Sequence, residues 1–134
     1  KGAALFCGGS QHGSRGYFIE PTILVTEDRH NPAFCEEFFG PVLTATPYDD
    51  INDIAGMAND SIYGLAAHLY TTNLNTAHQL SAQLDAGTVW VNTQLSPDPN
   101  IPFGGFKQSG WGRENGEDVL AHYTETKSVV MKVS

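Results

Sequence analysis

Positive charge is scarce in this sequence. Lys and Arg number 7 against 15 Asp and Glu in 134 residues, so the formal net charge is −8. A chain with so few cations has little with which to displace the counterions of duplex DNA or to bind an anionic lipid surface. No apolar run approaches the length that spans a bilayer. We therefore expect neither a nucleic-acid partner nor a membrane partner.

Cysteine is also rare, and the histidines are scattered. Cys7 and Cys35 are too few for a disulfide scaffold or a four-cysteine zinc site, which favours a reducing, cytoplasmic setting. The five His residues show none of the i, i+3 or i, i+4 spacings that present two ligands on one helix face, so we expect no metal site. The chain opens without Met or an apolar leader. We therefore expect no secretory signal, and we expect a piece of a longer protein.

The hydrophobic pattern predicts an α/β fold. After a Gly-rich loop over 1–16, strands are predicted at 17–25, 42–48, 64–71, 88–92 and 128–133. Helices are predicted after Asp49 and Asp50, after Asn73 or Asn75, and over 117–123. Strands and helices alternate from 42 to 92, which predicts a mostly parallel sheet with right-handed crossovers. Segment 64–71 is apolar enough for burial on both faces, and Gly87 is predicted to end a helix in the left-handed region.

Neither thiol has the surroundings of a nucleophile. Cys35 is followed by Glu36 and Glu37, and two adjacent carboxylates disfavour a thiolate. Cys7, between Phe6 and Gly8, has no better environment. We interpret both cysteines as structural, and His68, within a predicted strand, as a hydrogen-bonded core residue.

Two loops carry the remaining candidate chemistry. The Gly-rich segment 103–114 has neither the Walker spacing around Lys107 nor the dinucleotide fingerprint, so we expect a close-packed loop in which backbone approaches backbone. Segment 36–41, Glu-Glu-Phe-Phe-Gly-Pro, leaves two alternatives open. Its carboxylates could accept hydrogen bonds from ribose hydroxyls while a ring packs on a flat heterocycle, or it could be a solvated acidic loop over a core aromatic.

The order of several motifs resembles the C-terminal part of the catalytic domain of the NAD(P)-dependent aldehyde dehydrogenases. The motifs lie at 16–18, 21–22, 36–42, 58–60, 63–67, 86–92, 102–114 and 123–129. The resemblance implies oxidation of an aldehyde through a thiohemiacetal on a Cys, with hydride transfer to NAD or NADP. It also implies that 16–122 is a portion of the catalytic domain and that 123–134 is a strand that pairs with a neighbouring subunit of a homo-oligomer.

The resemblance also assigns roles to single residues. Glu37 matches the carboxylate that holds the nicotinamide ribose, and Phe39 matches the aromatic near the nicotinamide. Phe103 matches an aromatic wall of the aldehyde pocket. Glu114 matches a buried carboxylate of the water and proton relay. Arg113 and Glu125 match a charged pair at the subunit interface.

One departure from the family pattern limits what this chain can do. The family's nucleophilic Cys, its water-activating Glu and its nucleotide-binding domain precede the region that is matched here, so we expect the isolated chain to be inactive. Two alternatives stay open: a portion of an oxidoreductase, or a separate assembly module that self-associates. The loop 97–99 is similar to that of aromatic-aldehyde members such as phenylacetaldehyde dehydrogenases. Betaine-aldehyde-like members stay possible, and nothing in the chain selects NAD over NADP.

Overall fold

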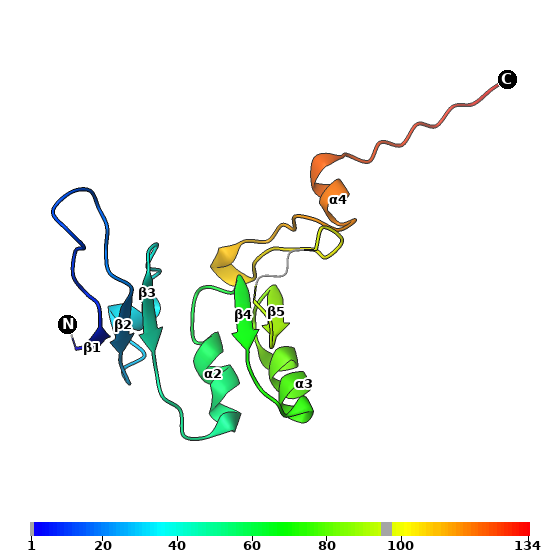
Figure 1. The fold of residues 1–134 in the computed structure, drawn as a ribbon. Coiled ribbons are helices and arrows are strands. Elements are labelled where there is room, and N and C mark those ends of the chain that lie inside the picture. Colours follow the sequence, from blue (N-terminus) through cyan, green and yellow to red (C-terminus); the bar gives the residue numbers. More distant parts are fainter. Residues whose placement is uncertain (1, 95–97) are drawn as a thin grey trace. The chain divides into compact units, whose positions relative to one another are not determined.

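The computed structural model describes residues 2–94 and 98–134. The chain divides into two compact units, Lys1–Asp53 and Ile54–Ser134. Each unit contains its own small sheet, three-stranded in the first and two-stranded in the second (Figure 1).

The first sheet has the order β1-β2-β3, formed by β1 (Ala4–Cys7), β2 (Thr22–Val25) and β3 (Val42–Ala45). Strand β1 is antiparallel to β2, and β2 is parallel to β3 in a register that pairs Thr22 with Val42. The prediction of a loop over 1–16 is therefore wrong at 4–7. The predicted strand 17–25 begins only at Thr22, because Pro21 lacks the N–H that a ladder needs.

A hairpin joins β1 to β2, and a short helix follows β2. Within the hairpin the His12 N–H donates to the Phe18 carbonyl at 2.8 Å. Helix α1 (Pro32–Cys35) was not predicted from the sequence. The Asn31 side chain caps it by accepting from the Ala33 N–H at 2.9 Å, and Pro32 stands at the first helical position, where its missing N–H costs nothing.

The second unit contains a β-α-β arrangement. It comprises β4 (Ala66–Leu69), α3 (Leu74–Gln83) and β5 (Thr88–Val91), and β4 and β5 are parallel with Ala66 opposite Thr88. Asn73 caps α3, as predicted, by accepting from the Thr76 N–H at 3.1 Å. The helix predicted after Asp50 forms as a 3-10 turn, η1 (Ile51–Asp53), followed by α2 (Ile54–Asn59).

Gly87 has a different role from the one predicted. Helix α3 ends at Leu84 in an extended conformation, and Gly87 is not among the residues with positive φ. A Cβ built on Gly87 would overlap the carbonyl oxygen of Gly104. Glycine is required here because two backbone segments lie in close contact, and not because the residue adopts the left-handed conformation of a helix C-cap.

The C-terminal region contains a 3-10 turn, η2 (Lys107–Ser109), and helix α4 (Val119–Tyr123). Residues 124–134 form no strand, and every one of them is exposed. The strand predicted at 128–133 is therefore absent from this chain by itself. A strand needs a partner for its N–H and C=O groups, and the second unit places no strand beside this segment.

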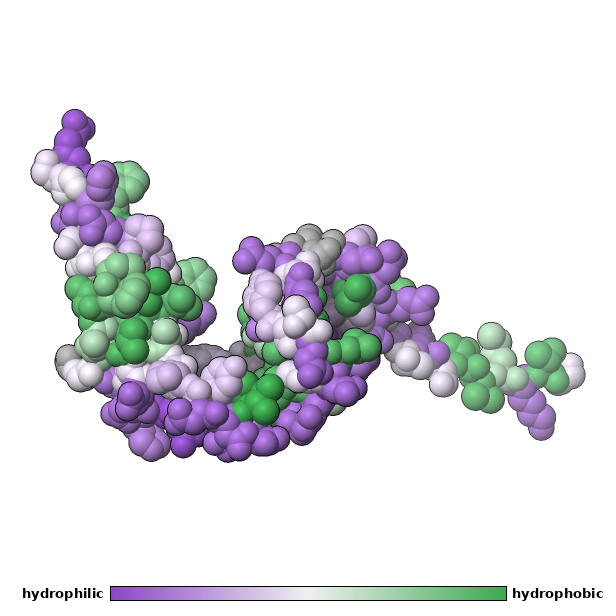
Figure 2. Space-filling model, turned by 60° about the horizontal axis from the view of Figure 1, so that its bottom comes forward, coloured by the Kyte–Doolittle hydropathy of each residue, from purple (hydrophilic) through white to green (hydrophobic). Residues whose placement is uncertain are grey.

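Much apolar surface is exposed. Among the described residues, the buried apolar side chains are Ala55 and Leu80, and apolar side chains are visible on the first unit and along the C-terminal segment (Figure 2). The chain exposes 10766 Å², whereas two compact globules of this combined mass would expose about 8,000 Å². The prediction that 64–71 is buried on both faces is wrong, since Ala66 and His68 are exposed. No helix in the described part is long and apolar enough to cross a bilayer.

Candidate functional site

An open groove in the second unit brings together three of the predicted site residues. Its volume is about 550 Å³, and Phe103, Arg113 and Glu114 line it together with His122 and Tyr123. These side chains come from the Gly-rich segment and from α4. The groove therefore joins an aromatic ring, a cation and a carboxylate.

Phe103 and Glu114 are held opposite one another by two backbone hydrogen bonds. The N–H of each donates to the carbonyl of the other, and both distances are 2.7 Å. Phe103 is half-buried, while Glu114 is exposed rather than buried as the family match implied. Main-chain hydrogen bonds therefore fix the backbone of Phe103 next to that of Glu114.

An aromatic row from the β4–β5 sheet leads to Phe103. The Trp90 and Phe103 ring centroids are 6.3 Å apart, and Trp90 stacks on His68 at 4.9 Å with 20° between the ring planes. His68 Nδ1 lies 3.4 Å from the Thr93 carbonyl oxygen. His68 is thus hydrogen-bonded as predicted, but it is exposed and not a core residue.

The predicted close approach of backbone in the Gly-rich segment is confirmed. A Cβ on Gly104 would overlap the Gly112 carbonyl, and a Cβ on Gly105 would lie 2.6 Å from the Ser109 carbonyl carbon. Any side chain at these positions would push the two facing backbone segments of the loop apart. The glycines serve packing, and nothing about them requires a phosphate.

The Arg113 side chain has its hydrogen-bond partners within this loop, while its main-chain N–H donates to His122 Nε2 in α4 at 3.2 Å. Its Nη1 donates to the carbonyls of Gly105 at 3.0 Å and Gly112 at 2.8 Å, and its guanidinium carbon lies 5.4 Å from the centroid of the Phe106 ring. Glu125 is exposed in the segment after α4. The described contacts include no ion pair between Arg113 and Glu125, so their interface role stays a prediction.

Glu37 and Phe39 belong to the first unit, in the loop between α1 and β3. Glu37 is exposed, Phe38 is 42% exposed and Phe39 is 99% exposed. The alternative of an acidic loop over a core aromatic is therefore wrong, because neither ring is in a core. The cofactor contacts of Glu37 and Phe39 stay predictions.

The two thiols are free and exposed, so neither fills the interior. Cys35 Sγ lies 2.9 Å from the Arg29 carbonyl oxygen, to which its S–H donates. Across residues 2–94 and 98–134, no cluster of His, Cys, Asp and Glu could hold a metal ion. Pro97, part of the loop 97–99 that suggested a substrate class, lies outside the described residues.

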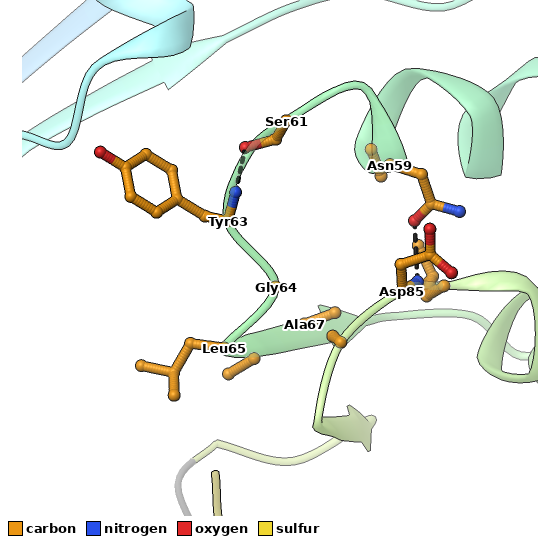
Figure 3. Close-up of a pocket in the computed structure, with 11 residues that line it drawn as sticks. Asn59, Ser61, Tyr63, Gly64, Leu65, Ala67 and Asp85 are labelled. Carbon is orange, nitrogen blue, oxygen red and sulfur yellow. Dashed lines mark hydrogen bonds between the residues drawn. The ribbon is translucent and has the colours of Figure 1, made fainter. Parts of the chain in front are cut away.

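A second cavity, of about 280 Å³, lies where the ends of α2 and α3 meet the start of β4. Asn59 and Asp85 face one another on one side of it, while the Tyr63 ring points away from them (Figure 3). The Asp85 N–H donates to Asn59 Oδ1 at 2.8 Å. No ligand was predicted for this cavity, and most of its lining residues are apolar.

Two residues of the second unit, Asn92 and Lys107, make structural contacts that were not predicted from the sequence. Asn92 has φ of +54°, and its side chain both donates to the Thr71 carbonyl and accepts from the Thr71 N–H, at 2.8 and 2.9 Å. An Asn directly after a strand was an available signal, since Asn tolerates this conformation. Lys107 does not fit the Walker spacing, and no local pattern in the sequence points to Asn59 and Asp85, which its ammonium contacts.

The comparisons with known proteins agree on one family. The model of the aldehyde dehydrogenase family matches residues 1–129. The chain is 47% identical over 132 residues to the phenylacetaldehyde dehydrogenase of Pseudomonas fluorescens, covering 97% of this chain and 26% of that protein. It is 50% identical over 134 residues to an aldehyde dehydrogenase of Davidiella tassiana, covering 98% and 27%. The chain thus spans about a quarter of the length of these relatives.

Solved structures give the same result. The indole-3-acetaldehyde dehydrogenase AldA of P. syringae, in complex with NAD+ and IAA, matches with a TM-score of 0.91 and 42% identity, covering 98% of this chain and 27% of that one. The NAD+ complex of an aldehyde dehydrogenase from Bacillus cereus matches with a TM-score of 0.92 and 42% identity, covering 99% and 27%. Both the sequence and the fold therefore place this chain in the aldehyde dehydrogenase family.

Proposed function

We propose that this chain is the C-terminal part of the catalytic domain of an NAD(P)-dependent aldehyde dehydrogenase, and that it supplies cofactor and substrate contacts to a site completed by other polypeptide. The observation that carries the proposal is the match over nearly the whole chain to about a quarter of a longer enzyme. The large exposed apolar area supports it, because such area is stable only when something covers it.

The residues of the first unit fit a nicotinamide cofactor. Glu37 offers an exposed carboxylate that can accept hydrogen bonds from ribose hydroxyls, and Phe39 offers a ring face with nothing packed against it. When bound, the cofactor accepts the hydride that the aldehyde loses. The proposed role of Glu37 and Phe39 is to bind and orient, and the preference between NAD and NADP lies with other residues.

The residues of the groove fit an aldehyde with an aromatic or other flat apolar group. Phe103, backed by Trp90, presents a ring surface, and two relatives are named for phenylacetaldehyde and indole-3-acetaldehyde. Glu114 stands beside that wall and can hold or pass a proton of the water that hydrolyses a thioester. The thiol that forms the thiohemiacetal and thioester is proposed to lie outside this chain, because Cys7 and Cys35 have no place in the motif order.

A fusion protein tests the proposed function. We join the part of the Pseudomonas fluorescens phenylacetaldehyde dehydrogenase that precedes the matched region to residue 1 of this chain. The fusion is expected to form NADH from NAD+ and phenylacetaldehyde, while the 134-residue chain by itself forms none. Absorbance at the NADH band measures both, and the upstream part alone is the control. Turnover by the isolated chain would overturn the claim of a missing nucleophile; a folded but inactive fusion would overturn the proposed function.

The second candidate function, an assembly module, rests on the C-terminal segment. Val129, Met131 and Val133 alternate along the sequence, which would put them on one face of a strand, and they are 66%, 81% and 90% exposed. We propose that 123–134 adds as a strand to the sheet of another subunit, which pairs its backbone and covers this apolar face.

The free thiols support a reducing compartment such as the cytoplasm for the assembled enzyme.

Two substitutions on opposite faces of this segment test the strand. Met131→Asp is expected to convert an assembled fusion protein to smaller species in sedimentation velocity, because it buries a charge in the new interface. Lys132→Asp, on the opposite face, is expected to leave the sedimentation coefficient unchanged. If Met131→Asp leaves the assembly intact, or if both variants dissociate it equally, the segment does not pair as a one-faced strand.

A further inference from the structure

We propose that Lys107 is a positioning residue that fixes the Phe103–Glu114 loop against the ends of helices α2 and α3. Its side chain reaches Asn59 and Asp85, which lie 48 and 22 residues earlier in the chain. The consequence for the aldehyde site rests on the proposed function, while the mechanical role of Lys107 stands apart from it.

The ammonium of Lys107 joins two segments. Its Nζ donates to the Asn59 main-chain carbonyl at 2.7 Å and lies 3.5 Å from Asp85 Oδ2. The Lys107 side chain is 27% exposed and that of Asp85 is 55% exposed, so solvent weakens the ion pair. The short bond to a carbonyl at the end of α2 is the stronger and more directional of the two contacts.

Asn59 completes a three-way junction. Its Nδ2 donates to the Gln83 carbonyl at 2.7 Å. Its Oδ1 accepts from the Asp85 N–H at 2.8 Å (Figure 3). These bonds tie the end of α2 to the end of α3. Lys107 adds the η2 turn as the third segment, so the Asn59 amide and the Lys107 ammonium join all three segments.

The backbone at Lys107 indicates that the side chain matters. Its φ is +51°, a conformation that glycine adopts without strain and that lysine rarely adopts. Backbone bonds on either side hold the turn there: the Phe106 N–H donates to the Gly64 carbonyl at 2.8 Å, and the Gln108 N–H to the Ile62 carbonyl at 2.9 Å. The contacts of the ammonium offset the strain that a lysine brings to this position.

The η2 turn is linked to the candidate site through the main chain. It lies between Phe103 and Glu114 in the sequence, and Gly104 and Gly105, on its Phe103 side, have no room for a Cβ because main-chain atoms of the loop lie against them. A shift of the turn would therefore move the Phe103 backbone, and the two hydrogen bonds between Phe103 and Glu114 would pass that movement on to Glu114. Lys107 is not among the residues that line the groove, so its effect is exerted through these neighbours.

Amide hydrogen exchange of the 134-residue chain tests the positioning role directly. We compare the chain with Lys107→Asn, because asparagine tolerates positive φ but cannot reach both partners, and with Lys107→Arg, which keeps a long cation. In the Asn variant the amides of Phe103 and Glu114 are expected to exchange about 10 to 100 times faster, while the Asn92 amide of the β4–β5 sheet stays within about threefold. In the Arg variant all three are expected to stay within about threefold.

Lys127→Asn is the matched control for Lys107→Asn. Lys127→Asn makes the same change of charge in the exposed C-terminal segment and is expected to alter none of these rates. Unchanged exchange at Phe103 and Glu114 in Lys107→Asn would overturn the proposal. Equal acceleration at Asn92 would also overturn it, because Lys107 would then support the whole unit rather than position the loop.

Substrate selectivity of the fusion enzyme tests the consequence for the aldehyde site. Lys107→Asn is expected to lower the ratio of kcat/KM for phenylacetaldehyde to that for acetaldehyde about tenfold, because only the larger aldehyde needs Phe103 in place. A lower fraction of folded enzyme would lower both kcat/KM values equally and leave this ratio unchanged. An unchanged ratio would therefore contradict the proposal. An inactive unsubstituted fusion would instead count against the proposed function, and the exchange rates would still decide the role of Lys107.

Discussion

Gly87→Ala is expected to lower the free energy of unfolding of this chain by about 3 kcal/mol. The added Cβ would overlap the carbonyl oxygen of Gly104 and lie 2.8 Å from its carbonyl carbon. Both atoms are main chain, so no side-chain rotation can relieve the contact. The β5 start and the Gly-rich loop would have to separate, and the Gly87 N–H, which donates to the Gly64 carbonyl at 3.0 Å, would be displaced with them.

Urea unfolding followed by circular dichroism measures this change, and Gly56→Ala is its matched control. Gly56 lies within α2, and nothing stands within 4 Å of a Cβ built on it. Alanine there is expected to stabilise the chain by about 0.5–1 kcal/mol, because it favours the helical backbone. Equal unfolding midpoints for the two variants would show that the two loops move apart freely and that the close packing has no energetic weight.

Phe39→Ala is expected to raise the KM for NAD+ of the fusion enzyme by about 10- to 100-fold. The ring is 99% exposed in this chain, so nothing in the first unit depends on it for folding. Burial of a phenylalanine side chain against a ligand contributes about 1.5–3 kcal/mol, which corresponds to this range. The loss should therefore be a loss of cofactor binding rather than of stability.

Steady-state kinetics at varied NAD+ and a thermal unfolding curve of the isolated chain separate the two effects. Phe39→Tyr keeps the ring face and is expected to change the KM for NAD+ less than about threefold. An unchanged KM in Phe39→Ala would remove Phe39 from the cofactor site. A lower unfolding temperature of the isolated Ala variant would show that the ring packs within the chain after all.

The elements best predicted from the sequence are those that local chemistry determines. Asn73 or Asn75 was predicted as the helix cap, and Asn73 is the cap. The β4–α3–β5 unit follows from the apolar periodicity and has parallel strands. Strand β1 was missed because a Gly-rich flank hides a short strand whose partner residues lie 16 to 21 positions away. Helix α1 was missed because one turn of helix offers almost no periodicity to read.

The candidate site divides in the same way. Phe103, Glu114, Glu37 and Phe39 were predicted as site residues because ordered motifs carry the family pattern, and their roles stay predictions. The backbone pairing of Phe103 with Glu114 followed only from the structure. Lys107 and Asn59 were not identified as partners, because 48 residues separate them and no spacing rule relates such distant positions.

The order of residues along this chain determined its family and its alternation of strands and helices, and it predicts which side chains contact a cofactor or an aldehyde. Those properties depend on local periodicity and on short motifs, which can be recognised without the three-dimensional structure. Only the tertiary structure decided which glycines have no room for a side chain, which lysine holds the loop, and which apolar faces stay uncovered. Close packing joins atoms from distant parts of the sequence, so these properties exist only once the backbone has folded.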